Sequence, residues 1–236
     1  MARKQSVSRD MHRVDPGNSD RSMTKSKGRG VMKRLIFALA AMLGLLGVFT
    51  PTASAETPIN QCVGTWSVVV GGLNNNNSDG FFNQNQRVGY NSYDTRAGVN
   101  ELNRLTRDHR RFCPGDHIKM VGHSGGAAVV HVWLTENGTG FGNINAVLLA
   151  DPKRPAGPGG PGFAQTDFPF NLYPPLAGAD NFYSGVPVWT VCNNSDHICN
   201  SQATWDGYFV GGTHDAYDKD VNHYSDWGNG QDYRWF

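Results

Sequence analysis

A serine framed by glycines is the feature of this sequence that most directly indicates chemistry. Residues Gly122–Gly126 read Gly-His-Ser-Gly-Gly, which satisfies the pattern G-x-S-x-G of a nucleophilic serine on a sharp turn from strand to helix. The flanks agree, because the apolar run His117–Val121 predicts a strand and an alanine- and valine-rich helical stretch follows the turn. The hydroxyl of Ser124 is therefore predicted to attack an acyl carbon. The N–H of Gly125, at the helix start, would stabilise the resulting oxyanion.

The serine needs two partners, because its hydroxyl attacks an ester only when a base accepts the proton and a carboxylate orients that base. With this serine turn, the partners follow along the chain in the order acid, then histidine. Asp196 lies between Cys192 and Cys199, just after the predicted strand Val186–Val191, and a disulfide there would hold its carboxylate rigidly. Asp151 also follows a predicted strand, but we expect it to end that strand by local hydrogen bonds.

These motifs together resemble one protein family. An aspartate inside a Cys…Asp-x-x-Cys loop after a late strand, the serine turn and an earlier cysteine pair are similar to the cutinase-like serine esterases of the α/β-hydrolase superfamily. The likeness extends to hydrolase domains of actinobacterial cell-surface proteins and to phage mycolyl esterases, and it covers Cys62 to about Tyr217. It implies a three-layer α/β sandwich with a mostly parallel central sheet and little or no lid.

The resemblance also assigns the remaining site residues. In this family the base is a histidine with an aromatic residue three positions later, and His214 followed by Tyr217 fits that pattern. His223, which a tyrosine follows directly, stays open as an alternative base. The resemblance points to the backbone N–H of Leu73, in the turn after the first strand, as a second oxyanion donor.

The rest of the sequence predicts the elements that position these residues. Apolar runs alternate with helical stretches, which is typical of a parallel sheet covered by helices. Besides the strands named above, we expect strands over Trp66–Val70 and Ile144–Ala150. One helix is expected from Asp94 or Thr95 to about Arg111, and a second over Gly125–Glu136.

The N-terminus has the features of a secretory leader. Basic residues precede the apolar run Leu35–Phe49, and Ala53–Ala55 forms a small-residue cleavage site. We therefore expect residues 1–55 to be removed and residues 56–236 to form one α/β-hydrolase domain. The alternative, a membrane anchor, would need about 20 apolar residues, more than this run contains. Because the leader is unusually long and polar before Met32, that methionine is an alternative start.

Four cysteines follow the leader: Cys62, Cys113, Cys192 and Cys199. An even number in an exported chain favours two disulfides, for which three pairings are possible. The close pair Cys192 and Cys199 would bracket one loop, which leaves Cys62 and Cys113 to tie the start of the domain to the end of its first helix. The alternative, a zinc site built from all four, lacks the paired short spacings of such sites.

Charge and motifs exclude several classes of ligand. The chain has 21 basic and 20 acidic residues, but ten basic and three acidic ones lie in residues 1–55, so the remainder has a net charge of −6. That balance disfavours nucleic acid as a partner. The sequence contains no zinc-protease, phosphate-loop or dinucleotide motif, so we expect neither a metal nor an organic cofactor.

The sequence thus predicts a secreted serine esterase of cutinase or lipase type that forms an acyl-enzyme through Ser124, His214 and Asp196. Its partner would be an ester or lipid substrate. After processing, the chain would have no stable transmembrane segment, and association with the cell envelope stays open. Two alternatives remain: an acyltransferase that transfers acyl groups to cell-envelope alcohols, and a non-catalytic module that binds the envelope. Acyl length and alcohol identity depend on two predicted substrate-side loops, Leu73–Asn85 and Lys153–Gly178.

Overall fold

The computed structural model describes four stretches of the chain: residues 60–155, 160–165, 185–226 and 231–235. The leader, its cleavage site and Met32 lie outside the described residues, so the signal peptide stays a prediction. Most of the predicted loop Lys153–Gly178 also lies outside them. Among the helices that are described, none is long and apolar enough to cross a membrane.

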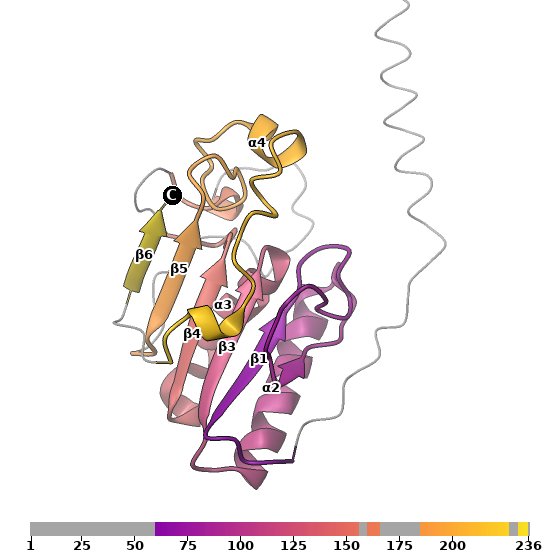
Figure 1. Ribbon diagram of the computed structural model, residues 1–236, viewed down its shortest axis with the longest axis vertical. Coiled ribbons are helices and arrows are strands. Elements are labelled where there is room, and N and C mark those ends of the chain that lie inside the picture. Colours follow the sequence, from indigo (N-terminus) through magenta and orange to yellow (C-terminus); the bar gives the residue numbers. More distant parts are fainter. Residues whose placement is uncertain (1–59, 156–159, 166–184, 227–230, 236) are drawn as a thin grey trace, which may run out of the picture. The chain divides into compact units, whose positions relative to one another are not determined.

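The described strands form a single sheet in the order β2-β1-β3-β4-β5-β6, and every neighbouring pair is parallel (Figure 1). Their bounds are β1 Thr65–Val70, β2 Gln86–Arg87, β3 His117–His123, β4 Ile144–Leu149, β5 Val188–Cys192 and β6 Gln231–Trp235. Parallel sheets are covered on both faces, which explains why β3 and β4 are buried along their whole lengths. The predicted α/β class is confirmed.

Strands β1, β3, β4 and β5 and the two long helices lie within two residues of the predicted bounds. Strands β2 and β6 were not predicted from the sequence. Neither is an apolar run: β2 is a glutamine and an arginine, and β6 reads Gln-Asp-Tyr-Arg-Trp. Their places at the two edges of the sheet come from pairing with β1 and β5 and not from a local pattern.

Two long helices, α2 (Thr95–Phe112) and α3 (Gly125–Asn137), lie together on one face of the sheet (Figure 1). As predicted, Asp94 caps α2, because its side chain accepts a hydrogen bond of 2.9 Å from the N–H of Ala97. Both helices share one hydrophobic cluster with alternate residues of the central strands. Its members include Leu102, Leu105, Val129, Trp133, Val68, Met120 and Leu148.

The opposite face of the sheet carries a second hydrophobic cluster. The strand residues that alternate with those of the first cluster pack here against the segment that contains the short helix η5 (Val221–His223). This segment crosses in front of the strands in Figure 1. Strand and segment residues of this cluster include Val69, Val121, Val147, Tyr217, Val221 and Tyr224. The third layer over this part of the sheet is therefore largely irregular chain.

A buried lysine ties that segment to the sheet. Lys119 of β3 donates from Nζ to the carbonyl oxygens of Val221 at 3.1 Å and Tyr224 at 2.8 Å, and it forms an ion pair with Asp226. An unpaired ammonium would be costly at this depth, so these contacts fix the segment in one position. The other short helices are α4 (Trp205–Phe209), η2 (Gly138–Phe141) and η3 (Phe163–Gln165).

The four cysteines form two disulfides, Cys62–Cys113 and Cys192–Cys199. The predicted pairing is confirmed, and it leaves no thiolates for the alternative zinc site. The first bridge ties the chain before β1 to the end of α2. The second closes a seven-residue separation directly after β5.

Removing the first bridge should destabilise the domain more than removing the second. A Cys62→Ser, Cys113→Ser variant should lose about 4 kcal/mol of unfolding free energy, because the bridge restricts a 51-residue separation in the unfolded chain. The matched Cys192→Ser, Cys199→Ser variant should lose about 2.5 kcal/mol. Chemical denaturation measures both, and a larger loss for the shorter loop would contradict this explanation.

Candidate active site

Ser124 stands on a strained turn between β3 and α3. Its backbone has φ 58° and ψ −125°, a conformation that a side chain strongly disfavours. The turn is also crowded: a Cβ on Gly122 would come within 2.5 Å of the Gly126 carbonyl oxygen, and one on Gly126 within 2.1 Å of the Val70 carbonyl oxygen. A Cβ on Gly125 would meet nothing closer than 3.6 Å. Close packing thus explains the two outer glycines of G-x-S-x-G.

The chain brings Asp196 and His214 into direct contact. The Nδ1 of His214 lies 2.9 Å from Oδ2 of Asp196, and the aspartate is fully buried. A carboxylate at this distance holds the proton on Nδ1, which leaves Nε2 of the neutral ring free to accept another. The predicted acid and base are therefore hydrogen-bonded to each other.

Two further donors complete the surroundings of the Asp196 carboxylate. The backbone N–H of Ile198 donates to Oδ1 at 3.0 Å, and the Tyr217 hydroxyl donates to Oδ2 at 2.8 Å. Burial alone would raise the pKa of Asp196, but these hydrogen bonds and the one from His214 outweigh it and hold the pKa below its ordinary value. Asp196 is therefore ionised at neutral pH. In the sequence Tyr217 only marks the family pattern, whereas in the structure it binds the Asp196 carboxylate.

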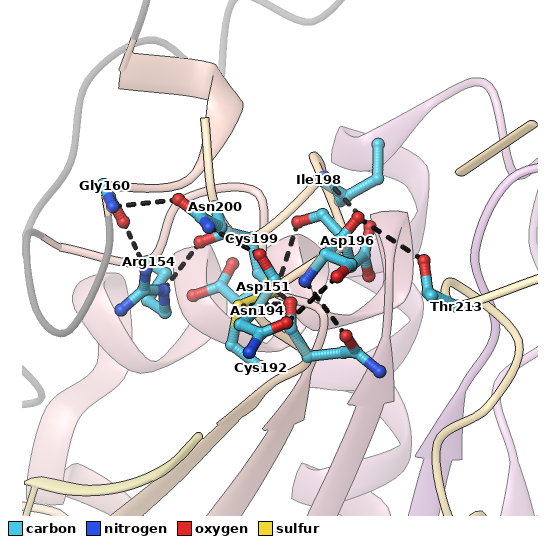
Figure 2. The surroundings of a disulfide bond; sticks show 12 residues. Asp151, Arg154, Gly160, Cys192, Asn194, Asp196, Ile198, Cys199, Asn200 and Thr213 are labelled. Carbon is cyan, nitrogen blue, oxygen red and sulfur yellow. Dashed lines mark hydrogen bonds between the residues drawn. A yellow bond between two sulfur atoms is a disulfide. The ribbon is translucent and has the colours of Figure 1, made fainter. Parts of the chain in front are cut away.

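A buried arginine supports the loop that carries the acid (Figure 2). Arg154 is fully buried and donates from Nε to the Cys199 carbonyl oxygen at 2.7 Å and from a guanidinium N–H to that of Gly160. The N–H of Gly160 in turn donates to the side chain of Asn200 at 2.9 Å. The Cys192–Cys199 disulfide and this arginine therefore hold the loop from two sides. The sequence pattern revealed the disulfide but not the arginine.

Ser124 and His214 line one cavity of about 300 Å³. Gly72 and Leu73, from the turn after β1, line it as well. The turn approaches so closely that a Cβ on Gly72 would lie 2.7 Å from that of Ser124, and the Leu73 nitrogen lies 3.6 Å from the Cβ position of Gly125. The backbone nitrogen of Leu73, one predicted oxyanion donor, therefore lies close to Gly125, the residue that carries the other.

Hydrogen bonds tie the asparagine-rich loop after β1 to the chain on either side of it. The Ser78 hydroxyl accepts from the N–H of Gly71 at 2.8 Å and donates to the Val88 carbonyl oxygen at 2.6 Å. The Tyr90 hydroxyl donates to the Gly71 carbonyl oxygen at 2.6 Å. These bonds fix the backbone next to Leu73, in a stretch for which the sequence predicts only a loop.

A family model described as Cutinase matches residues 44–227. The chain belongs to the cutinase family. No curated protein gives a significant match. Among solved structures, a cutinase-like protein from Cryptococcus sp. is 16% identical, with a TM-score of 0.43 over 71% of this chain and 90% of that one. An acetylxylan esterase is 17% identical, with a TM-score of 0.43 over 67% of this chain and 92% of that one.

In this cutinase family member the two candidate bases lie in different surroundings, which the sequence could not show. His223 is 62% exposed on η5, and its Nδ1 lies 2.6 Å from Oδ2 of Asp218. It is not among the residues that line the Ser124 cavity. His214 lines that cavity and contacts the buried acid. Geometry therefore favours His214.

Asp151 forms hydrogen bonds with Lys153 and His131 and does not line the cavity. It is fully buried, with Oδ1 accepting from the N–H of Lys153 at 2.9 Å, the local bond that was expected. Its Oδ2 lies 2.6 Å from Nδ1 of His131, which is buried on α3. Asp151 thus joins the end of β4 to the nucleophile helix.

His123, beside the serine, has a positioning contact that sequence reasoning missed. Its Nε2–H donates to the backbone carbonyl oxygen of His214 at 2.8 Å, and the two rings lie 4.8 Å apart. Burial, reinforced by electrostatic interactions with the neighbouring His214 and Lys219, lowers the pKa of His123 to about 3. His123 is therefore neutral and anchors the backbone of the candidate base. The sequence signal that could have revealed this contact is the position of a histidine, a hydrogen-bond donor, directly before the nucleophile.

His123 should make the protein less stable in mild acid. Its pKa when folded lies below the ordinary 6.5, so between pH 6.5 and 3 the unfolded chain binds a proton that the folded chain does not. The unfolding free energy therefore falls as the pH drops through this range, by about 2 kcal/mol for this group at pH 5. His123→Gln keeps an N–H donor but does not titrate. Denaturation at pH 7 and pH 5 should show a smaller difference for this variant, and equal differences would contradict the assignment.

Proposed function

We propose that this cutinase family member is a secreted serine esterase that hydrolyses carboxylic esters. The observation that carries the proposal is one cavity lined by Ser124 and His214, with His214 hydrogen-bonded to the buried Asp196. Family membership supports ester hydrolysis as the reaction class. The two disulfides are consistent with an extracellular protein.

In the proposed reaction, Oγ of Ser124 attacks the ester carbonyl carbon while Nε2 of His214 takes the hydroxyl proton. Asp196 stabilises the imidazolium that forms. The carbonyl oxygen becomes an oxyanion and accepts hydrogen bonds from the N–H groups of Gly125 and Leu73, each worth about 3 kcal/mol in the transition state. The C–O bond to the alcohol then breaks as His214 returns the proton to the leaving oxygen.

Water completes the proposed cycle. His214 removes a proton from a water molecule that attacks the acyl-enzyme, a second oxyanion forms at the same donors, and the proton returns to Oγ of Ser124 as the acid leaves. Tyr217 and His123 act as positioning residues, since one holds the acid and the other holds the backbone of the base. No step in this scheme calls for a metal or an organic cofactor.

Titration with a fluorophosphonate tests the nucleophile. The folded, secreted protein should form one adduct, which mass spectrometry places on Ser124, and should hydrolyse 4-nitrophenyl esters. Ser124→Ala should form no adduct and lose about 10⁴-fold or more in kcat. Its thermal transition should stay near that of the wild type, because the turn accommodates a smaller side chain. Turnover near wild type would remove Ser124 from the mechanism.

A matched pair of histidine variants tests the base. His214→Ala should lower kcat by about 10⁴-fold, because the serine then lacks a proton acceptor. His223→Ala removes an exposed histidine only nine residues further along and should leave kcat within about twofold of wild type. The reverse result, with the larger loss in His223→Ala, would assign the base to His223.

Two other results would point to the alternatives. Transfer of acyl groups to an added sugar in place of water, detected by product analysis, would indicate an acyltransferase that uses the same nucleophile. Absence of both adduct and turnover, together with retained binding to cell-envelope lipid, would indicate a non-catalytic module. The acyl-chain optimum of the 4-nitrophenyl series would begin to define the substrate.

A further inference from the structure

One charged side chain in the cavity has no part in the proposed triad. Lys219 lines the cavity together with Ser124 and His214. Its backbone position is set by the short segment before η5, where its carbonyl oxygen accepts from the N–H of Phe82 at 3.0 Å. The side chain is 21% exposed, so most of its surface is already covered by protein.

The ammonium group of Lys219 is poorly compensated by the residues that the structure describes. The neighbouring carboxylate of Asp215 has its Oδ1 4.0 Å from Nζ, beyond hydrogen-bond distance, and the side chain of Asp215 is 84% exposed. A lysine side chain that is mostly covered by protein normally has a carboxylate or several acceptors closer to its ammonium group. Lys119 shows the ordinary arrangement in this same protein, with two carbonyl oxygens and a carboxylate around its Nζ.

The positive charge acts on the cavity itself. Lys219 is one of the groups that lower the pKa of His123, which lines the same cavity, so its field reaches the residues around the serine. The other side chains that line the cavity are mostly polar: Asn75, Tyr208 and Asp215 have this character, and Leu73 is aliphatic. Such a lining suits a polar group better than a long alkyl chain.

We propose that Lys219 binds an anionic group of the substrate, so that the preferred esters carry a carboxylate or phosphate a few bonds from the scissile carbonyl. The short separation follows from the size of the cavity, about 300 Å³, which must hold both the ester and the anion. The inference rests on the proposed function, because it places the anion beside the ester that Ser124 attacks. Asp215 weakens the site, since its carboxylate competes for the same ammonium.

Binding to an inactive variant tests the anion site independently of catalysis. In the Ser124→Ala protein, 4-acetoxybenzoate should bind more tightly than its neutral counterpart 4-acetoxybenzamide. Adding Lys219→Met should raise the Kd of the benzoate about fivefold and change that of the benzamide much less, since a partly exposed ion pair is lost. Lys219→Arg should restore the preference, and Asp215→Asn should strengthen it. Isothermal titration calorimetry measures each Kd.

Turnover by the active protein distinguishes the possible positions and kinds of anion. A 4-nitrophenyl monoester of adipic acid, compared with 4-nitrophenyl hexanoate, places the carboxylate on the acyl side. The pair of 4-acetoxybenzoate and 4-acetoxybenzamide tests a carboxylate on the alcohol side. In 4-acetoxyphenyl phosphate a phosphate takes the place of that carboxylate. Lys219→Met should reduce kcat/KM for at least one anionic ester about fivefold relative to its neutral partner.

A charge-matched control separates a local effect from a general one. Arg111→Met removes one positive charge from the last turn of α2, which precedes the start of β3, whereas Ser124 follows its end. This variant should keep the wild-type preference. If Lys219→Met lowers the values for anionic and neutral esters equally, or if no anionic ester or ligand is preferred, the proposal is wrong. If no ester is hydrolysed but the Kd difference persists, the anion site stands and the esterase proposal fails.

Discussion

The buried carboxylate of Asp196 imposes the strictest requirement on this structure. A charge that is wholly removed from water is tolerated only where hydrogen bonds replace the lost hydration. Here His214, Tyr217 and the N–H of Ile198 supply them. Each of these donors must lie within a few tenths of an ångström of its place, so the loop after β5 and the segment of residues 214–217 are fixed relative to each other.

Several features far apart in the sequence serve that requirement. The Cys192–Cys199 disulfide closes the acid loop, and Arg154 donates a hydrogen bond to the carbonyl oxygen of Cys199 (Figure 2). His123 holds the backbone of His214 from the side of the nucleophile. The same contacts that satisfy a buried charge therefore also hold an imidazole that lines the cavity of the serine, so that stability and the proposed chemistry depend on one network.

The sheet explains why these groups meet at all. In a parallel sheet the carboxyl ends of all strands lie at one edge, and the turns after β1, β3 and β5 carry Leu73, Ser124 and Asp196 respectively. The strained turn at Ser124 is possible because Gly72, Gly122 and Gly126 let three backbones approach closely. Lys219 enters the same space from the segment that crosses the other face, which the order of strands alone would not predict.

The sequence by itself determined the elements and the chemistry of the nucleophile. Apolar periodicity located four strands and both long helices, because burial of both sheet faces leaves a strong local pattern. Glycine spacing marked the serine turn, and cysteine spacing marked the acid loop. These signals are local, since the residues that produce each one are neighbours in the chain.

Tertiary structure alone decided which distant groups meet. Two histidines nine residues apart fitted the role of base, and only the fold separates His214, beside Asp196, from His223, which is exposed beside Asp218. The edge strands β2 and β6, the supporting Arg154 and the contact of His123 with His214 were likewise not predictable, because each depends on a partner remote in sequence. A sequence pattern records what a residue needs from its neighbours in the chain, whereas burial, charge compensation and a shared cavity are set by neighbours in space.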